Sequence, residues 1–175
     1  MTFTVRRLQP ADDRSKFRSG NPDLDRFFHQ YAGQNQFRHH IGATYVALDE
    51  GNAIVGFATV AASELPMEKL PNPKGRRLPA YPFPILRLAR LAVDSRSRGR
   101  GVSSALLNAV FALTHRMAAD LGCVGIVVDA KPEAVDYYLK LEFVPLEAVA
   151  GEMGDRPVPL PMFLELGAIP RSEKA

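Results

Sequence analysis

A glycine-rich loop with three arginines is the part of this sequence best suited to bind an anion. It runs Arg98-Gly99-Arg100-Gly101-Val102-Ser103 between a hydrophobic stretch and a helical pattern, and Arg96 lies just before it. Glycines let the main chain approach a phosphate closely, and the first N–H groups of a helix have no partner within the helix. Arginine side chains add positive charge. The loop therefore predicts a pyrophosphate site.

The spacing of the glycines excludes two common phosphate-binding loops. A Walker A loop requires Gly-Lys-Ser/Thr, which does not follow here. A dinucleotide-binding GxGxxG motif requires glycine at position 104, which is serine in this chain. A glycine-rich turn can also be purely structural, so the surrounding segments decide between the two interpretations.

Basic residues are concentrated around this loop. Residues 74–100 contain eight Lys or Arg and one acid, Asp94, which gives this segment a net charge of +7, whereas the whole chain carries +3. Residues 1–40 hold a smaller excess, with seven basic and four acidic residues. This distribution favours a polyanionic partner, either a phosphorylated cofactor or a nucleic acid. The alternative is a solvated, arginine-rich surface.

Length and composition indicate one globular domain over residues 1–175. Hydrophobic residues make up 46% and charged residues 23%, which excludes a disordered or fibrous protein. The uncharged stretch 101–114 is too short for a membrane span, and the N-terminus has no apolar signal region. The single cysteine, Cys123, excludes an internal disulfide and a cysteine-clustered zinc site. We expect a cytoplasmic protein that makes no membrane contact.

The hydrophobic pattern predicts one mixed α/β sheet with helices on both faces. Strand patterns occur at 3–8, 44–48, 53–62, 85–93, 123–129, 143–145 and 162–166. A first helix starts at Asn21-Pro22-Asp23, with Asn as the N-cap, and others are expected at 104–121 and 132–141. The first carries an apolar stripe of Leu24, Phe27, Phe28, Tyr31 and Ala32, and the second a row of Leu106, Val110, Leu113, Met117 and Leu121 before a stop at Gly122.

Two segments do not fit a regular element. Residues 64–84 contain six prolines and a Lys/Arg cluster, which predicts a long irregular loop. Loops of this length in a compact domain are commonly functional or mobile. We also expect the tail at 167–175 to be flexible.

The loop and its flanking segments resemble the acetyl-CoA pyrophosphate signature R/Q-x-x-G-x-G/A of the GNAT N-acetyltransferases. Ser103 occupies the last position of that signature, where the family has glycine or alanine. The run from Tyr137 to Phe143 resembles the family's YxxxGF ending, with Glu142 in place of its glycine.

Further stretches resemble the GNAT toxins of bacterial toxin–antitoxin pairs, from about Leu8 to Leu166. They are Asn21-Pro22-Asp23-Leu24-Asp25-Arg26-Phe27-Phe28, Thr44-Tyr45-Val46, Arg90-Leu91-Ala92-Val93-Asp94, Val128-Asp129-Ala130-Lys131 and Leu160-Pro161-Met162-Phe163-Leu164. The resemblance implies a single-domain GNAT fold with a mixed, mostly antiparallel sheet. It also implies an enzyme that acetylates the α-amine of aminoacyl-tRNA with acetyl-CoA and so blocks translation. Its expected partners are aminoacyl-tRNA, a ribbon-helix-helix antitoxin on a separate chain and a second copy of itself.

The same resemblance assigns roles to residues. The main chain of Leu91, Ala92 and Val93 would contact the pantetheine arm, and Arg98, Gly99, Arg100, Gly101, Val102, Ser103 and Ser104 would hold the pyrophosphate. Tyr138 matches the active-site tyrosine, whose phenol can protonate the departing thiolate. Its alternative role is packing between helix and sheet, and the neighbouring Tyr137 is the second candidate for the acid.

Other side chains with chemical potential are interpreted as follows. Arg76, Arg77, Arg87 and Arg90 are candidates for tRNA phosphate contacts, with strand support as the alternative for the last two. No general base stands out, which fits an α-amine that is already largely deprotonated near neutral pH. Cys123 lies in an apolar strand and is expected to be structural. His39 and His40 are adjacent and do not face one site on a helix, so no metal is expected.

Two alternative functions stay open at this level. One is a GNAT that acetylates a small amine or a protein N-terminus. The other is a non-catalytic module that binds acyl-CoA or RNA, for which Ser103 and Glu142 are the supporting departures from the family pattern.

Overall fold

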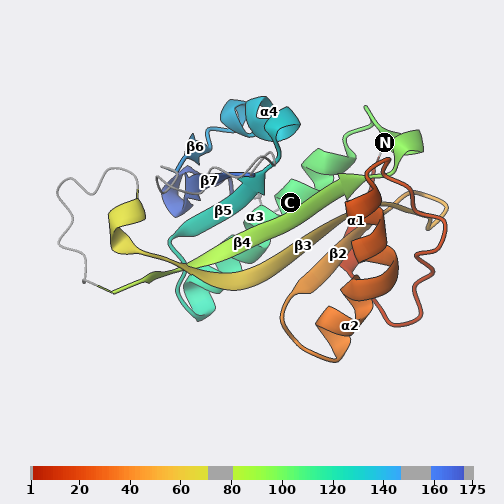
Figure 1. The fold of residues 1–175 in the computed structure, drawn as a ribbon, viewed down its shortest axis with the longest axis horizontal. Coiled ribbons are helices and arrows are strands. Elements are labelled where there is room, and N and C mark those ends of the chain that lie inside the picture. Colours follow the sequence, from red (N-terminus) through yellow and green to blue (C-terminus); the bar gives the residue numbers. More distant parts are fainter. Residues whose placement is uncertain (1, 71–80, 147–158, 172–175) are drawn as a thin grey trace. The chain divides into compact units, whose positions relative to one another are not determined.

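The computed structural model describes residues 2–70, 81–146 and 159–171, and its strands form one seven-stranded sheet in the order β1-β2-β3-β4-β5-β7-β6 (Figure 1). The strands are β1 Thr4–Arg7, β2 Ala43–Leu48, β3 Ile54–Leu65, β4 Phe83–Val93, β5 Gly125–Ala130, β6 Val144–Pro145 and β7 Leu160–Glu165. The pairs β1–β2, β2–β3, β5–β7 and β6–β7 are antiparallel. The predicted mixed, mostly antiparallel sheet is confirmed.

The helices occur where the sequence pattern predicts them. They are α1 Pro22–Arg26, the π-helical turn η1 Phe27–Tyr31, α2 Ala32–Phe37, α3 Val102–Asp120 and α4 Val135–Lys140. Four 3₁₀ turns are described, η2 Met67–Lys69, η3 Ser95–Ser97, η4 Pro132–Ala134 and η5 Leu166–Ala168. None of the described helices combines the length and the hydropathy that a bilayer span requires.

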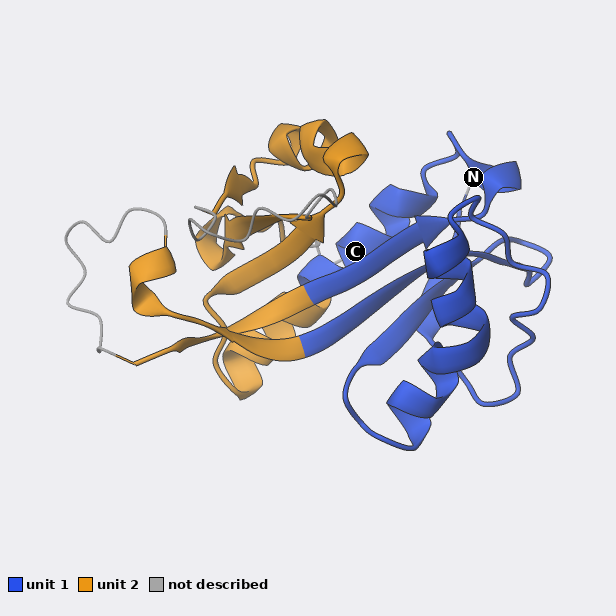
Figure 2. Ribbon diagram, viewed as in Figure 1, with its two compact units in different colours: residues 1–61, 88–112 blue, residues 62–87, 113–175 orange. Residues whose placement is uncertain are grey.

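The chain divides into two compact units, each with its own core (Figure 2). Unit 1 comprises residues 1–61 and 88–112, and unit 2 comprises residues 62–87 and 113–175. The unit 1 core contains Leu8, Phe17, Phe27, Phe28, Ala32, Val46, Leu48, Phe57 and Ala92. The unit 2 core contains Leu65, Ile85, Val127, Leu146 and Phe163.

Helices cover both faces of the sheet within unit 1. Phe57 of β3 points to one face, where its ring stacks on Phe28 with centroids 4.3 Å apart. Its neighbour Gly56 points to the other face, where an added Cβ would lie 2.6 Å from Cγ1 of Val102 in α3. Because successive side chains in a strand alternate between faces, the aromatic core and α3 lie on opposite sides. The absent side chain of Gly56 lets the start of α3 approach β3 closely.

The first helix differs from its predicted form. Asn21 caps it as expected, with its side-chain oxygen accepting from the main-chain N–H groups of Asp23 and Leu24. The π-helical turn η1 then adds one residue per turn and rotates the chain relative to a regular α-helix. Tyr31 is consequently 43% exposed and leaves the predicted apolar stripe, while Phe28 stays fully buried.

The other boundaries shift by a few residues. Helix α3 ends as predicted before Gly122, whose φ of 101° closes the helix and whose N–H donates to the carbonyl of Met117. Leu121 lies beyond the last helical residue and is 83% exposed, so its predicted place in the apolar row is wrong. Strands β3 and β4 extend into the predicted loop at 64–84, of which 71–80 lie outside the described residues. In the C-terminal tail, Ile169 is buried and its carbonyl lies 3.1 Å from His115 Nε2.

Candidate active site

The glycine loop between η3 and α3 presents its main chain to open space. Gly99 has a φ of 77° and Gly101 a φ of 86°, both in the left-handed region that residues with a side chain avoid. A Cβ added at either position would meet no atom of the described residues within 4 Å, apart from its chain neighbours. Helix α3 starts at Val102, so the N–H groups of its first turn have no partner within the helix. This arrangement can hold a diphosphate through backbone donors.

The three arginines near the loop have different partners. Arg96 donates from Nε and Nη2 to the carboxylate of Asp94, which neutralises its charge. The guanidinium of Arg98 donates to the carbonyl of Ser19. Arg100 is exposed and makes no hydrogen bond or ion pair with a described residue. Arg100 is therefore the arginine in this loop that is free to meet an anion.

Asp94 is a site residue that sequence reasoning did not assign. It is only 2% exposed and accepts from the main-chain N–H of Arg18 as well as from the main chain and side chain of Arg96. Burial acts to raise the pKa of Asp94, but these hydrogen bonds outweigh it and hold the pKa below its usual value. Its position as the one acid in the basic segment 74–100 was the signal available in the sequence.

The strand before the loop joins it to the unit 1 core. Ala92 is buried, and Leu91 and Val93 on either side are half-buried. The N–H of Asp94 donates to the carbonyl of Val55 over 2.8 Å, which fixes the end of β4 against β3. The predicted main-chain contacts of residues 91–93 with pantetheine stay a prediction.

Tyr138 lies on α4 in unit 2, and its ring packs edge-on against those of Tyr137 and Phe143, each with centroids 5.3 Å away. Burial raises the pKa of Tyr138 well above its usual value, and Tyr137 adds to the shift. The hydroxyl has no hydrogen-bond partner among the described residues, and none of their fully enclosed side-chain N or O atoms lacks one. The residue as a whole is 4% exposed. The hydroxyl stays protonated at neutral pH and can act as a donor.

The turn after α4 keeps its geometry with Glu142 in place of the glycine of the family pattern. Glu142 adopts a φ of 70°, the conformation for which the family pattern uses glycine. Its N–H donates to the carbonyl of Leu139, and the N–H of Phe143 donates to that of Tyr138. These two bonds and the contact between the Tyr138 and Phe143 rings form a Schellman motif. The local geometry is kept although the glycine is absent.

The candidate tRNA-binding arginines also differ in whether they have an acidic partner. Arg87 donates to both carboxylate oxygens of Asp129, at 2.9 and 2.8 Å. Arg90, on the same strand, lies over the ring of Phe27 with its guanidinium carbon 3.7 Å from the centroid. It is half-buried, has no acidic partner among the described residues, and burial lowers its pKa. Arg76 and Arg77 lie outside the described residues.

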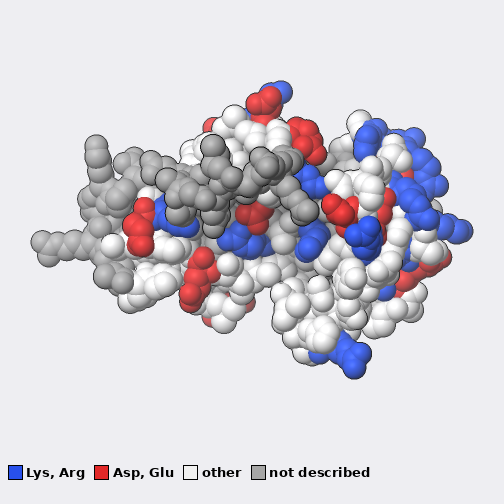
Figure 3. All heavy atoms as spheres, in the orientation of Figure 1, with Lys and Arg blue, Asp and Glu red and all other residues white. Residues whose placement is uncertain are grey.

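Basic side chains gather on one part of the surface. Figure 3 shows Lys and Arg side chains at the right-hand end of that view, over unit 1.

The remaining candidate residues are Cys123 and two histidines. Cys123 is buried, its thiol donates to the carbonyl of Gly125, and burial raises the pKa of the thiol, all of which fit a structural role. His39 and His40 are exposed, and the described residues contain no group of metal-binding side chains.

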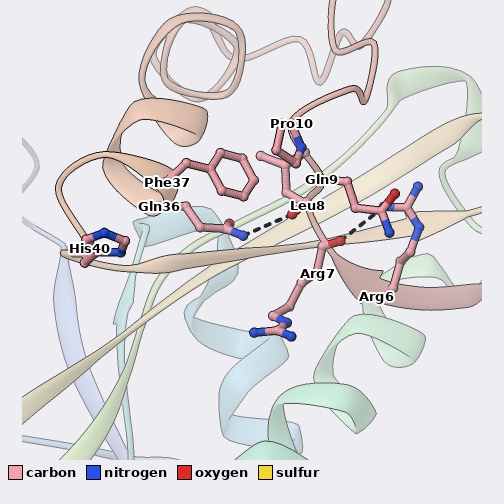
Figure 4. Close-up of a pocket in the computed structure, with 8 residues that line it drawn as sticks. All are labelled: Arg6, Arg7, Leu8, Gln9, Pro10, Gln36, Phe37 and His40. Carbon is pink, nitrogen blue, oxygen red and sulfur yellow. Dashed lines mark hydrogen bonds between the residues drawn. The ribbon is translucent and has the colours of Figure 1, made fainter.

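A separate pocket of about 590 Å³ lies within unit 1 (Figure 4). It is lined by Arg6, Arg7, Leu8, Gln9, Pro10, Gln36, Phe37 and His40. Gln36 bridges the carbonyl of Leu8 and the N–H of Thr44, and Arg6 is paired with Asp12. Two of its polar side chains thus serve the local structure, and the pocket shares no lining residue with the glycine loop.

Comparison with known proteins identifies the family of the chain. Residues 13–164 match the sequence profile of the acetyltransferase (GNAT) domain. The chain is 33% identical over 141 residues to a tRNA-acetylating toxin of Mycobacterium tuberculosis (strain ATCC 25618 / H37Rv), covering 79% of this chain and 82% of that protein.

Two solved structures share the fold. One is the crystal structure of a bacterial toxin, with a TM-score of 0.84 and 24% identity over 96% of this chain and 93% of the other. The other is AtaT complexed with acetyl-methionyl-tRNAfMet, with a TM-score of 0.80 and 22% identity over 96% and 97% of the two chains.

Proposed function

This chain belongs to the GNAT family of acetyltransferases, and on that basis we propose that it transfers the acetyl group of acetyl-CoA to the α-amine of aminoacyl-tRNA. The observation that carries the choice of acceptor is its similarity, over most of both chains, to a tRNA-acetylating toxin. The basic surface over unit 1 supports the same choice, because a tRNA acceptor is a polyanion. The proposal includes a dimer and a ribbon-helix-helix antitoxin on a separate chain.

The glycine loop supplies the donor side of the reaction. The N–H groups from Gly99 to Ser104 would hold the pyrophosphate of acetyl-CoA, with the side chain of Arg100 adding charge. Both glycines leave room for this contact, since no described residue other than their chain neighbours comes within 4 Å of the positions their Cβ atoms would take. Acetyl-CoA brings the thioester that the amine attacks.

Tyr138 is the proposed general acid. The amine nitrogen bonds to the thioester carbonyl carbon, the carbon–sulfur bond breaks, and the sulfur takes the proton of the tyrosine hydroxyl. The proton that the amine loses restores the hydroxyl. A tyrosine hydroxyl is protonated near neutral pH, so it carries the proton that the thiolate takes as the carbon–sulfur bond breaks. An α-amine titrates at about 7.7–8.0, so the reaction needs no strong base near neutral pH.

The two arginines of β4 give a matched test of acceptor binding. Arg90 has no acidic partner among the described residues, so its charge is available to a phosphate. Arg87 is neutralised by Asp129. We expect Arg90→Met to raise the KM for aminoacyl-tRNA about tenfold with little change in the KM for acetyl-CoA, because a charged hydrogen bond contributes about 1.5–3 kcal/mol. Arg87→Met should lower the melting temperature and leave the KM for tRNA within about twofold of the wild type once folded protein is assayed.

The acceptor itself is identified by tracing the label. Purified protein is incubated with acetyl-CoA labelled in the acetyl group and bulk charged tRNA, and the tRNA is then hydrolysed to release its amino acids. Labelled N-acetyl amino acids are the expected product. Label on polyamines or peptides, with none on tRNA, would instead identify the small-amine or N-terminal acetyltransferase. No transfer to any amine would indicate the non-catalytic binding module.

A further inference from the structure

We propose that Arg98 is a positioning residue that ties the glycine loop to residues 16–19 and holds its N–H groups ready for acetyl-CoA. In this arrangement Arg100 is the phosphate-binding arginine of the loop. The difference matters because the signature that includes Arg98 otherwise predicts a direct contact between this arginine and the pyrophosphate.

Four hydrogen bonds join residues 16–19 to Arg98 of the loop and to the segment just before it, all within unit 1. The guanidinium of Arg98 donates to the carbonyl of Ser19, and that of Arg96 to the carbonyl of Lys16. In the other two, a main-chain N–H group is the donor. The N–H of Arg18 donates to the Asp94 carboxylate at 3.1 Å, and the N–H of Ser95 donates to the Arg18 carbonyl at 2.8 Å. Arg98 makes the bond nearest to Gly99, so it determines how firmly the loop itself is held.

The acceptor of the Arg98 bond is fixed from its other side. Ser19 is 5% exposed, and its N–H and hydroxyl both donate to Oδ1 of Asp25 in α1, at 2.9 and 2.7 Å. The next residue, Gly20, has a φ of 89°, and an added Cβ would lie 3.3 Å from Nη2 of Arg98. The position beside the guanidinium is thus occupied by a residue without a side chain.

Tethering the loop reduces the entropy that ligand binding must remove. A segment with two glycines has more conformations to lose than other segments of equal length. A group that holds it in the binding arrangement therefore increases affinity without touching the ligand. Arg100 lies between the two left-handed glycines, is exposed and has no described partner, so its side chain is free to contact a phosphate.

The test compares binding of CoA with the mobility of the empty loop. CoA dissociation constants are measured by titration calorimetry. Hydrogen–deuterium exchange is followed without ligand in peptides that cover residues 94–105, where the N–H groups of Ser95, Ser97 and Ala105 are hydrogen-bonded. We expect Arg98→Ala to speed exchange of these amides and to raise the Kd for CoA about tenfold. With saturating acetyl-CoA its kcat should stay within about twofold of the wild type, and Arg98→Lys, which restores one donor, should recover part of both effects.

Two further variants separate the tether from a charge effect. Arg100→Ala should weaken CoA binding to a similar degree and leave exchange of the empty loop unchanged. Gly20→Ala keeps the charge of Arg98 but strains the chain beside the Ser19 carbonyl, because a side chain is disfavoured at a φ of 89° and its Cβ would press on Nη2 of Arg98. It should therefore speed exchange and weaken binding in the same direction as Arg98→Ala. It also serves as the test if Arg98→Ala does not fold, which the melting curve shows.

The proposal is overturned if Arg98→Ala weakens CoA binding without altering exchange of the empty loop, since that pattern identifies a direct phosphate ligand. It is equally overturned if neither quantity changes in Arg98→Ala and Gly20→Ala. The binding measurement uses CoA and the exchange measurement uses no ligand, so neither depends on aminoacyl-tRNA being the acceptor.

Discussion

Two bends of this protein both require a positive φ, and they place different residues there. The loop before α3 uses Gly99 and Gly101, and the turn after α4 uses Glu142 with a φ of 70°. No atom of the described residues fills the space beside the two glycines. Their lack of a side chain therefore serves the φ angle and, by our proposal, the approach of a ligand, whereas the turn after α4 has only to redirect the chain.

The turn tolerates a side chain because its hydrogen bonds fix it. The N–H groups of Glu142 and Phe143 both bond back to carbonyls of α4, and the Phe143 ring packs on Tyr138. A non-glycine residue in this conformation costs roughly 1–2 kcal/mol, which the Schellman motif offsets. The loop before α3 has no such closure, and its fixed points are the hydrogen bonds of Arg98 and Asp94.

The largest effect is expected on kcat when Tyr138 of α4 is changed, and it separates the chemical step from binding at the glycine loop. Tyr138→Phe keeps the ring that packs on Phe143 and removes only the hydroxyl. We expect kcat to fall about 10²–10⁴-fold, as for loss of a general acid, with the KM for acetyl-CoA within about twofold. Initial rates over a range of acetyl-CoA concentrations provide the measurement. An unchanged kcat would remove the acid role from Tyr138 and direct attention to Tyr137.

The next effect concerns the loop. Gly101→Ala places a Cβ on a residue with a φ of 86°, which costs about 1–2 kcal/mol and drives the loop away from its binding arrangement. We expect the KM for acetyl-CoA to rise roughly tenfold or more, since 1.4 kcal/mol is a factor of ten, while kcat changes less. Steady-state kinetics and a melting curve measure the two consequences. Wild-type affinity for acetyl-CoA in this variant would contradict the proposed cradle.

The smallest expected effect is an increase in stability. Glu142→Gly relieves the left-handed strain at the α4 turn and should stabilise the protein by about 1 kcal/mol, after the entropy that glycine loses on folding. For a chain of this size the expected rise in melting temperature is roughly 2–4 °C, with kinetics as in the wild type. A lower melting temperature would show that the Glu142 side chain makes a stabilising contribution, and the contrast between the two bends would then be weaker.

Sequence reasoning predicted most of the fold because the relevant signals are local. The Asn21 cap, the stop at Gly122 and the strand and helix periodicities each act within a few residues. The family signature located the glycine loop for the same reason. The errors lie where regular periodicity fails: the π-helical turn exposes Tyr31, and the end of α3 exposes Leu121.

The amino-acid sequence by itself determined the order of elements, the glycine loop and the family. Only the tertiary structure decided the partners of the long charged side chains. Arg98 bonds to Ser19, Arg87 to Asp129 and Arg90 to the Phe27 ring, each across at least 40 residues of chain. A flexible arginine side chain has many partners within reach, and no pattern of neighbouring residues selects one. The packing of distant segments makes that selection.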